Sequence, residues 1–375
     1  MRFLERERAT VAKLLPGLDE SLRAAPLMEL EGPDTPGIQL FRDSGGSGLL
    51  VPSGFTRGLG ATALDALRVQ RALGSRTPSL AVATTWHHFW VATLVDLDIA
   101  NNPSTITARK VASAAYDERL VAFCLAEERP GAGMLSSSLT AMYTDDGWLI
   151  NGVTRPCSLA RSLDPSCDWL AVMVTLPSDG EYDGAAAMAL VSPDAEGLSV
   201  SGAGAESEQA TLDNVVVDWT DLMIDNHDVP VDIPLTAGFV WFQLLMTGSY
   251  LGAASALVER VLLNDQVPES ERVRLLVEAE LAMSAAEGVA SRIDAGDPAE
   301  STLADALYVR YGVQDTLARI VPRAVDLLGH LGSTASDEVA HLATFTNGLA
   351  QQPPTQSQMA GPLAAYLAGG PLTLA

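Results

Sequence analysis

The chain has 375 residues, 47% of them hydrophobic, which is ample for a large core and too long for one simple domain. Its formal net charge of −24 makes the surface repel nucleic acid and anionic membranes, so we expect neither as a partner. Cys124, Cys157 and Cys167 are an odd number without CxxC spacing, and no signal peptide begins the chain, so we expect a reducing, cytoplasmic location. No His, Cys and carboxylate cluster has metal-site spacing, and no metal is predicted.

Residues 1–120 have the spacing of helices. Apolar residues recur three and four positions apart, and clear helices are predicted over 63–73 and 79–95. His87 and His88 are adjacent, which points their rings apart on a helix. We interpret them as ordinary core or surface histidines.

Residues 121–228 change to short apolar runs, separated by Gly, Asp, Pro and Ser. A hairpin turn signal, Asp145-Asp146-Gly147, lies between two of these runs. We therefore predict a small antiparallel β-domain that closes into a barrel. The runs occupy 140–143, 148–151, 169–176, 185–191, 198–201 and 215–219.

Residues 229–375 return to helical spacing. The segment from Ala237 to Val258 carries no charge and is long enough to span a bilayer. It is rich in small residues, and no basic residue lies close before it, so we predict a buried central helix. Long amphipathic helices at about 269–295 and 301–331 then predict a bundle with a partner surface.

The most informative stretch for chemistry runs from Val121 to Ser158. Its first apolar run ends before Pro130-Gly131-Ala132-Gly133, a turn at which backbone can approach a ligand closely. Ser136, Ser137 and Ser138 follow and offer hydroxyl and amide groups to a phosphate, although a solvated loop is an equally good interpretation.

This order of blocks resembles the acyl-CoA dehydrogenase family of flavoenzymes. The family's first strand ends in a T-E-P-x-A-G-S loop, and N-G-x-K-x-W-I-T follows a hairpin; here Asn151-Gly152 leads to Arg155-Pro156-Cys157-Ser158. The serial order of segments agrees over essentially the whole chain. The resemblance implies an α+β fold with an N-terminal helical domain (1–120), a central antiparallel β-barrel domain (121–228) and a C-terminal helical bundle (229–375).

The resemblance also implies FAD as the cofactor. Ser158 stands where the family's Thr bonds flavin N5, whereas Pro156 replaces the family's Trp. An Arg that contacts flavin in the family is absent from the stretch 264–268, which removes a charge-assisted hydrogen bond. The flavin would lie against Leu125, Ala126, Gly133, Ser136, Cys157 and Ser158.

The family's reaction dehydrogenates an acyl thioester, and a carboxylate removes the α-proton while flavin takes a hydride. The family places that base at one of two positions, which correspond here to Phe242 or Gln243 and to Asn347. None of these three residues is a carboxylate. We expect all three to line the substrate pocket and leave the catalytic base unassigned.

We therefore predict a flavin-dependent oxidoreductase of specialised metabolism that acts on an acyl thioester, carried by CoA or a carrier protein. One alternative is a flavin monooxygenase, because relatives on this scaffold lack the Glu and oxidise nitrogen. Another is a non-redox binding protein or partner subunit that keeps only the fold. Family members pair their long C-terminal helices between subunits, so we expect a homodimer or homotetramer.

Overall fold

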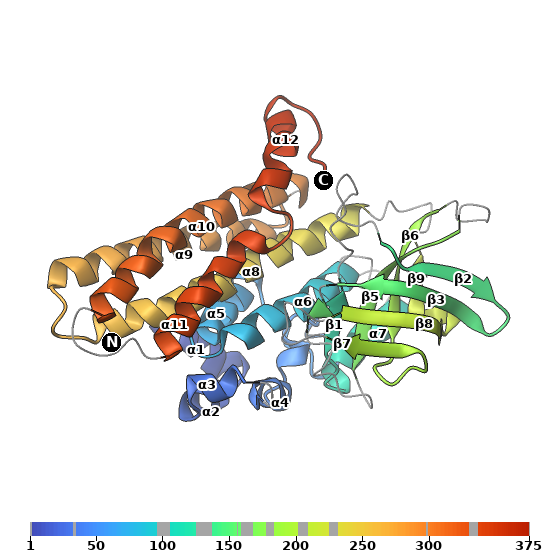
Figure 1. Cartoon of the computed structure of the whole chain (residues 1–375), viewed down its shortest axis with the longest axis horizontal. Helices are drawn as coiled ribbons and strands as arrows, with labels where there is room; N and C mark the ends of the chain where they lie inside the picture. Colours follow the sequence, from blue (N-terminus) through green and yellow to red (C-terminus); the bar gives the residue numbers. More distant parts are fainter. Residues whose placement is uncertain are drawn as a thin grey trace.

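The computed structural model describes residues 2–32, 35–95, 106–124, 137–155, 157–158, 168–177, 184–201, 209–224, 232–297, 299–329 and 337–374. Helices occupy both ends of the chain and strands its middle, and Figure 1 shows most of the helices packed together on one side, with the sheet and the helix before its first strand on the other. The first helices are α1 (Glu5–Leu14), α2 (Leu18–Ala24), α3 (Leu27–Leu30), α4 (Gly37–Asp43), η1 (Gly46–Gly48), α5 (Ala63–Gly74), α6 (Pro78–Leu94) and α7 (Ile106–Tyr116).

One sheet contains all the strands of the described residues, in the order β4-β1-β5-β2-β3-β8-β7, with β6 between β5 and β9. The predicted hairpin is confirmed, since β2 pairs antiparallel with β3 and Thr144 lies opposite Gly147. The strands are β1 (Val121–Cys124), β2 (Thr140–Thr144), β3 (Gly147–Thr154), β4 (Cys157–Ser158), β5 (Trp169–Thr175), β6 (Ala186–Val191), β7 (Leu198–Ser201), β8 (Gln209–Val217) and β9 (Leu222–Ile224).

The sheet differs from the predicted antiparallel barrel in two respects. Over the described strands it does not close, because β4 and β7 end the order of pairing. In addition, β5 runs parallel to both β1 and β2. The chain places the β2–β3 hairpin before it returns as β5, and β5 then lies between β1 and β2. Short apolar runs do not specify this crossover.

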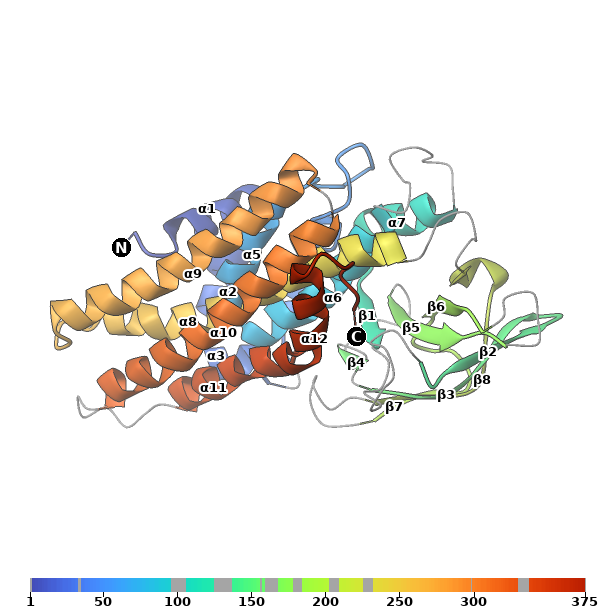
Figure 2. The same cartoon turned by 90° about the horizontal axis from the view of Figure 1, so that it is seen from above.

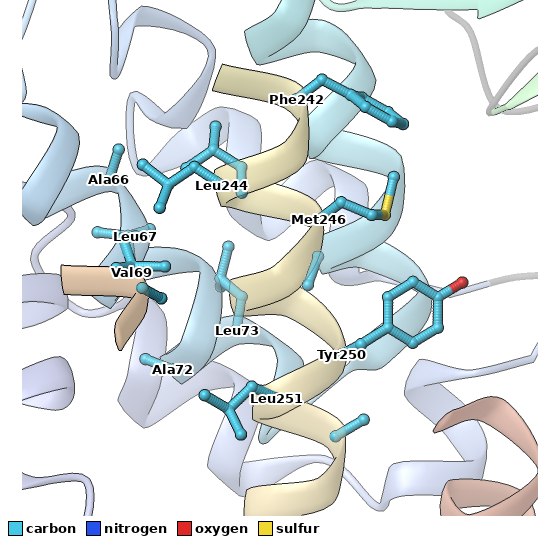
Figure 3. Close-up of a cluster of buried hydrophobic side chains, with 14 of the residues drawn as sticks. Ala66, Leu67, Val69, Ala72, Leu73, Phe242, Leu244, Met246, Tyr250 and Leu251 are labelled. Carbon is cyan, nitrogen blue, oxygen red and sulfur yellow. The ribbon is translucent and has the colours of Figure 1, made fainter. Parts of the chain in front are cut away.

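The central helix α8 (Asp232–Leu262) packs against α5, α6, α9, α10 and α11. It contacts α5 so closely that a methyl group at Gly252 would lie 2.8 Å from the Cα of Gly74. Leu67 and Leu73 of α5 and Leu244 and Leu251 of α8 fill the space around this crossing (Figure 3). The expected buried helix is thus confirmed, and no helix in the described part of the chain is long and apolar enough to cross a membrane.

The last helices are α9 (Glu269–Ala295), α10 (Ala299–Gly329), α11 (Asp337–Thr346), η5 (Asn347–Gln351) and α12 (Gln356–Leu367). Figure 2 shows α9 and α10 side by side along the molecule, where they pack on each other. Ion pairs bridge them, including Arg323–Glu271 at 2.9 Å and Arg319–Glu278 at 3.3 Å.

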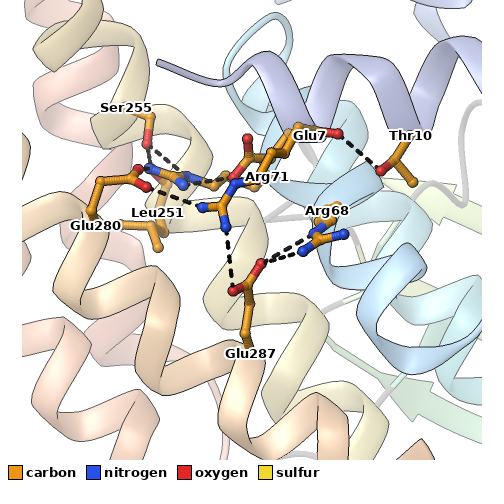
Figure 4. A network of polar contacts seen from close by, with 9 residues as sticks. Glu7, Thr10, Arg68, Arg71, Leu251, Ser255, Glu280 and Glu287 are labelled. Carbon is orange, nitrogen blue, oxygen red and sulfur yellow. Dashed lines mark hydrogen bonds and ion pairs between the residues drawn. The ribbon is translucent and has the colours of Figure 1, made fainter. Parts of the chain in front are cut away.

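Buried arginines link elements that lie far apart in sequence. Arg71 of α5 is fully buried and donates to Glu7, Glu280 and Ser255, which joins α1, α9 and α8 (Figure 4). Arg42 of α4 binds both carboxylate oxygens of Asp168 at 2.8 and 2.7 Å, and Asp168 also accepts the amide of Leu120. These pairs fix the N-terminal helices against the rest of the molecule.

Both histidines of α6 are fully buried. His87 contacts the Ser47 carbonyl through Nε2 at 2.8 Å and accepts the Val121 amide at Nδ1, whereas neither ring nitrogen of His88 has a hydrogen-bond partner among the described residues. Burial lowers the pKa of His87 to about 4. Burial, with a smaller effect of His87, lowers the pKa of His88 well below its ordinary value. Both are therefore core residues, but the expectation that their rings point apart is wrong, since the ring centroids lie 5.3 Å from each other.

We expect His88→Leu to raise the free energy of unfolding by about 1 kcal/mol at pH 7.5, because it removes a buried polar ring without hydrogen bonds. The unfolded chain binds a proton at His87 and at His88 near pH 6.5, whereas in the folded chain burial lowers both pKa values, so stability falls as the pH falls below about 6.5. Urea unfolding at pH 7.5 and pH 5 should show a loss about 2 kcal/mol smaller for His88→Leu than for the unsubstituted protein. Equal losses would contradict this assignment.

Candidate functional site

The half of α8 nearest the sheet carries Phe242 and Gln243, two of the residues predicted to line the substrate pocket. Phe242 is fully buried, and its ring centroid lies 4.4 Å from that of Trp86 on α6. Trp86 in turn stacks on Phe123 of β1, with centroids 5.7 Å apart and ring planes within 3°. We call Trp86, Phe123 and Phe242 the aromatic wall. Its rings come from α6, from α8 and from β1, the strand that leads into the predicted flavin-binding segment. These three rings are buried and pack against one another.

Gln243 faces away from the wall and meets a buried arginine. The guanidinium of Arg310, on α10, donates to the Gln243 side-chain oxygen and to the Pro353 carbonyl, the latter at 3.0 Å. Its other nitrogen donates to the carbonyls of Leu349, at 3.3 Å, and Gln352. Gln243 donates to the Pro353 carbonyl at 3.3 Å as well. The arginine therefore fastens the segment 349–353 to α8.

Two tyrosines extend this arrangement. Tyr311 donates to the Pro354 carbonyl at 2.9 Å, and the Gln352 amide donates to the Tyr250 hydroxyl at 2.9 Å. Burial raises the pKa of Tyr311 to about 12, so this hydroxyl keeps its proton at neutral pH. We call Gln243, Tyr250, Arg310, Tyr311 and the segment 349–354 the arginine cluster.

The arginine cluster holds a positive charge without a negative one. Burial lowers the pKa of Arg310 to about 10, which still leaves the guanidinium charged at neutral pH. Its hydrogen-bond partners are an amide side chain and backbone carbonyls, and none of them is a carboxylate. Removal of an α-proton therefore has no candidate base among the described residues of the cluster. The same charge disfavours a second cation nearby.

The predicted flavin residues are only partly described. Leu125, Ala126, Gly133 and Ser136 lie outside the described residues. Cys157 is buried in β4 and bonded through sulfur to Cys124 of β1. Ser158 lies opposite Phe123 in the same strand pair. The cysteine spacing did not suggest this disulfide, which arises because antiparallel pairing brings the two residues face to face.

The third predicted pocket residue lies elsewhere. Asn347 begins η5 and is exposed, whereas the tail residue that contacts Gln243 is Pro353.

Arg310 and Tyr311 were not predicted, although one signal was available: Arg310 interrupts the apolar face formed by Leu303, Leu307 and Leu317. A charged residue on a buried helix face often marks a site, because an arginine is seldom fully buried without partners. No group of residues suited to a metal ion occurs in the described part of the chain.

No family model matches the chain. It is 39% identical to isobutylamine N-hydroxylase of Streptomyces viridifaciens over 384 residues, which cover 100% of both proteins. Among solved structures, FMN-bound TdsC from Paenibacillus sp. A11-2 has a TM-score of 0.77 at 18% identity, covering 100% of this chain and 99% of TdsC. TdsC is a dibenzothiophene monooxygenase.

Two further structures share the fold. The prolyl acyl carrier protein oxidase AnaB has a TM-score of 0.77 at 15% identity, covering 96% of this chain and 98% of AnaB. A glutaryl-coenzyme A dehydrogenase has a TM-score of 0.74 at 17% identity, covering 100% and 96%. The fold is therefore that of the acyl-CoA dehydrogenase-like flavoproteins. Together with the full-length relative, it shows that the chain belongs to the acyl-CoA dehydrogenase family, as the residue blocks implied.

We expect Arg310→Leu to lower the free energy of unfolding by about 3 kcal/mol or more, because several buried oxygens lose their donor at about 1–3 kcal/mol each. Arg319→Leu is the matched control on the same helix, since Arg319 is exposed and its ion pair with Glu278 is worth at most about 1 kcal/mol. Urea unfolding at pH 7.5 measures both. Similar small losses for the two variants would contradict the role given to Arg310.

Proposed function

We propose that the protein is a flavin-dependent N-hydroxylase of a small aliphatic amine. The observation that supports this most strongly is its 39% identity, over the full length, to isobutylamine N-hydroxylase. The site is compatible with it. An amine nitrogen attacks an activated oxygen through its own lone pair, so the reaction does not need the α-proton base that the arginine cluster lacks.

The proposed reaction converts an amine, molecular oxygen, two electrons and two protons into a hydroxylamine and water. Reduced flavin, when bound, supplies the two electrons and activates the oxygen. The residues of this chain bind the amine, orient its nitrogen and exclude water. Only the uncharged amine has a free lone pair, so the free base is the reactive form of the substrate. The buried rings of Trp86 and Phe242 keep water out.

For the cofactor we propose FAD, which the residue blocks around Ser158 imply. FMN is the alternative, since TdsC binds FMN. Fluorescence titration of the protein with each flavin separates the two, because free flavin fluorescence changes on binding. Electrons would reach the site as reduced flavin or through a bound flavin that a partner reduces.

Acyl-thioester oxidation is the second candidate function, and family membership supports it. The chain shares its fold with the carrier-protein oxidase AnaB, but the sequence identity of 15% supports a common fold and not a common substrate. Against it stands the lack of a carboxylate in the described arginine cluster. Positioned proton transfer is typically worth roughly 10²–10⁴-fold in rate, so an acyl-CoA oxidised at ordinary rates would favour this candidate and require a base outside the described residues.

The test of amine hydroxylation is direct. With oxygen, reduced FAD or FMN and isobutylamine, mass spectrometry should detect a product heavier by one oxygen atom. kcat/KM should rise about tenfold per pH unit between pH 7 and 9, because aliphatic amines titrate near pH 10 and only the free base binds. A pH-independent kcat/KM would contradict binding of the free base. Absence of hydroxylamine under all these conditions would contradict the proposed function.

We also propose a homo-oligomer formed through the outward face of α9. Over more than five helical turns this face is made mainly of small and apolar residues, although 19% of the chain is charged, and its two exposed arginines, Arg274 and Arg292, pair with Glu278 and Asp305. The charges beside it are paired within the chain, by Glu278–Arg319 on one side and Glu287–Arg68 on the other. An apolar strip with a polar rim is typical of an interface. The exposed residues of the strip are Val273, Val277, Leu281, Ser284, Ala285, Gly288, Ser291 and Ala295.

Leu281→Glu should dissociate the oligomer, because it places a charge at the middle of the strip. Light scattering should then report the 39.4 kDa chain mass, whereas the unsubstituted protein should show a multiple of it. Leu263→Glu is the matched control, since both leucines are 65% exposed but Leu263 lies outside the strip. A monomeric unsubstituted protein, or equal behaviour of the two variants, would contradict the proposal.

A further inference from the structure

The last helix, α12, has an outward face that is unusual for a surface helix. Its inward face is anchored by Met359, which is fully buried, and by the partly buried Leu363. A surface helix normally turns charged or polar side chains to solvent. The exposed outward face of α12 instead consists of small and apolar residues, namely Ala360, Gly361, Ala364, Ala365 and Leu367. Both sides of α12 are therefore apolar, as in α8, but α12 leaves one of them uncovered by its own chain.

The lack of charge extends over the whole C-terminal end. No charged side chain occurs between Asn347 and Ala375, although 19% of the chain is charged. Leu367 is 76% exposed, the largest exposed fraction among the large hydrophobic side chains of the described residues. Figure 1 shows α12 standing out from the other helices. We call residues 356–374 the C-terminal arm. Exposed apolar surface of this kind marks a contact with another molecule.

The C-terminal arm is held in a fixed direction. The segment before it, 349–354, belongs to the arginine cluster. Thr355 then begins α12 with a capping box, in which its hydroxyl accepts the Gln358 amide and its own amide donates to the Gln358 side chain. At the far end, the Leu372 amide donates to the Glu300 carboxylate at 2.7 Å. The arm is therefore a preformed surface, which lowers the ordering cost of binding.

The arm lies at one end of the apolar strip on α9. Glu300, which binds the Leu372 amide, is in the first turn of α10. That turn follows directly on the short connection after Ala295, the last residue of the strip. The end of the arm and the end of the strip thus meet at the junction of α9 and α10. A molecule that covers the strip can extend onto the arm.

The charge of the chain indicates which molecule covers the arm. Each copy has a net charge of −24, so two copies repel each other unless their contact is free of charge. A partner of opposite charge would be recognised through charged side chains, and the arm has none. The small residues of α12 also permit two helices to approach closely, as Gly74 and Gly252 do inside the molecule. A second copy of this chain fits these conditions.

We propose that the C-terminal arm binds a second copy of this chain, beside the strip on α9. In a symmetric pair each copy contributes its arm to the other, so the contact is made twice. The inference rests on the self-association in the proposed function and adds a second element to the same interface. It is independent of the flavin and of the amine.

The first measurement places a charge on the arm. Leu367→Glu should raise the dissociation constant of the oligomer about tenfold or more, because the carboxylate would have to be buried in an apolar contact. Light scattering over a dilution series measures this. Circular dichroism should remain unchanged, since the Leu367 side chain is exposed in the single chain. Leu263→Glu, at 65% exposure and away from arm and strip, should leave the dissociation constant as it is. An unchanged constant for Leu367→Glu would overturn the proposal.

The second measurement identifies what the arm touches and does not depend on a weakened oligomer. Leu367 is replaced by the photoreactive p-benzoylphenylalanine, and Leu263 is replaced in the control. After irradiation of the purified protein, denaturing electrophoresis should show a species of twice the 39.4 kDa chain mass for position 367 and none for position 263. Cross-links confined to single chains, or equal yields at the two positions, would overturn the proposal. Irradiation in a cell extract that joins position 367 to a different protein alone would overturn it as well.

The arm and the strip can fail separately. If Leu281→Glu dissociates the oligomer while Leu367→Glu and the cross-link show no effect, the arm is overturned and the strip stands. If position 367 cross-links two copies in an oligomer that Leu281→Glu leaves intact, the strip is overturned and the arm stands. An unsubstituted protein that is monomeric at micromolar concentration would overturn both. Amine hydroxylation enters none of these results.

Discussion

The contact of α5 with α8, where Gly74 and Gly252 let two backbones touch, is the constraint on which the helical part of the molecule depends. A side chain at either position would separate the helices, and α8 also packs against α6, α9, α10 and α11. Because α8 carries no charge between Ala237 and Val258, every face of it can be buried. The crossing near the middle of α8 thus fixes the position of this helix along its axis. That position brings Phe242 against Trp86 and Gln243 against Arg310.

Three buried arginines differ in the charge of their hydrogen-bond partners. Arg71 and Arg42 are each matched by carboxylates, and they join elements that lie far apart in sequence. Arg310 has only neutral partners. A buried charge without a counter-ion is unfavourable unless its hydrogen bonds are well satisfied. The Gln243 side chain and the carbonyls of Leu349, Gln352 and Pro353 supply those hydrogen bonds to Arg310.

Much of the fold followed from local pattern. The uncharged segment predicted α8, the spacing of apolar residues predicted α5 and α6, and Asp145-Asp146-Gly147 predicted the hairpin. The parallel pairing of β5 did not follow, because it joins strands far apart in sequence. The same is true of Arg310, whose partners at 349–353 and 243 lie on separate segments, and of the Cys124–Cys157 bond. The family blocks indicated the lack of a carboxylate at Phe242 and Gln243, but only the fold shows what meets Gln243 instead.

The attachment of the segment 349–353 to Arg310 has a consequence for biosynthesis. A ribosome makes α8 and α10 before it makes this segment, so the face of α8 that carries Gln243 stays open until the C-terminal part of the chain emerges. Until then Arg310 lacks the carbonyls that receive its hydrogen bonds, and its charge is best solvated by water. A chain clipped before residue 349 would therefore leave the Arg310 guanidinium without these carbonyl partners and open to water.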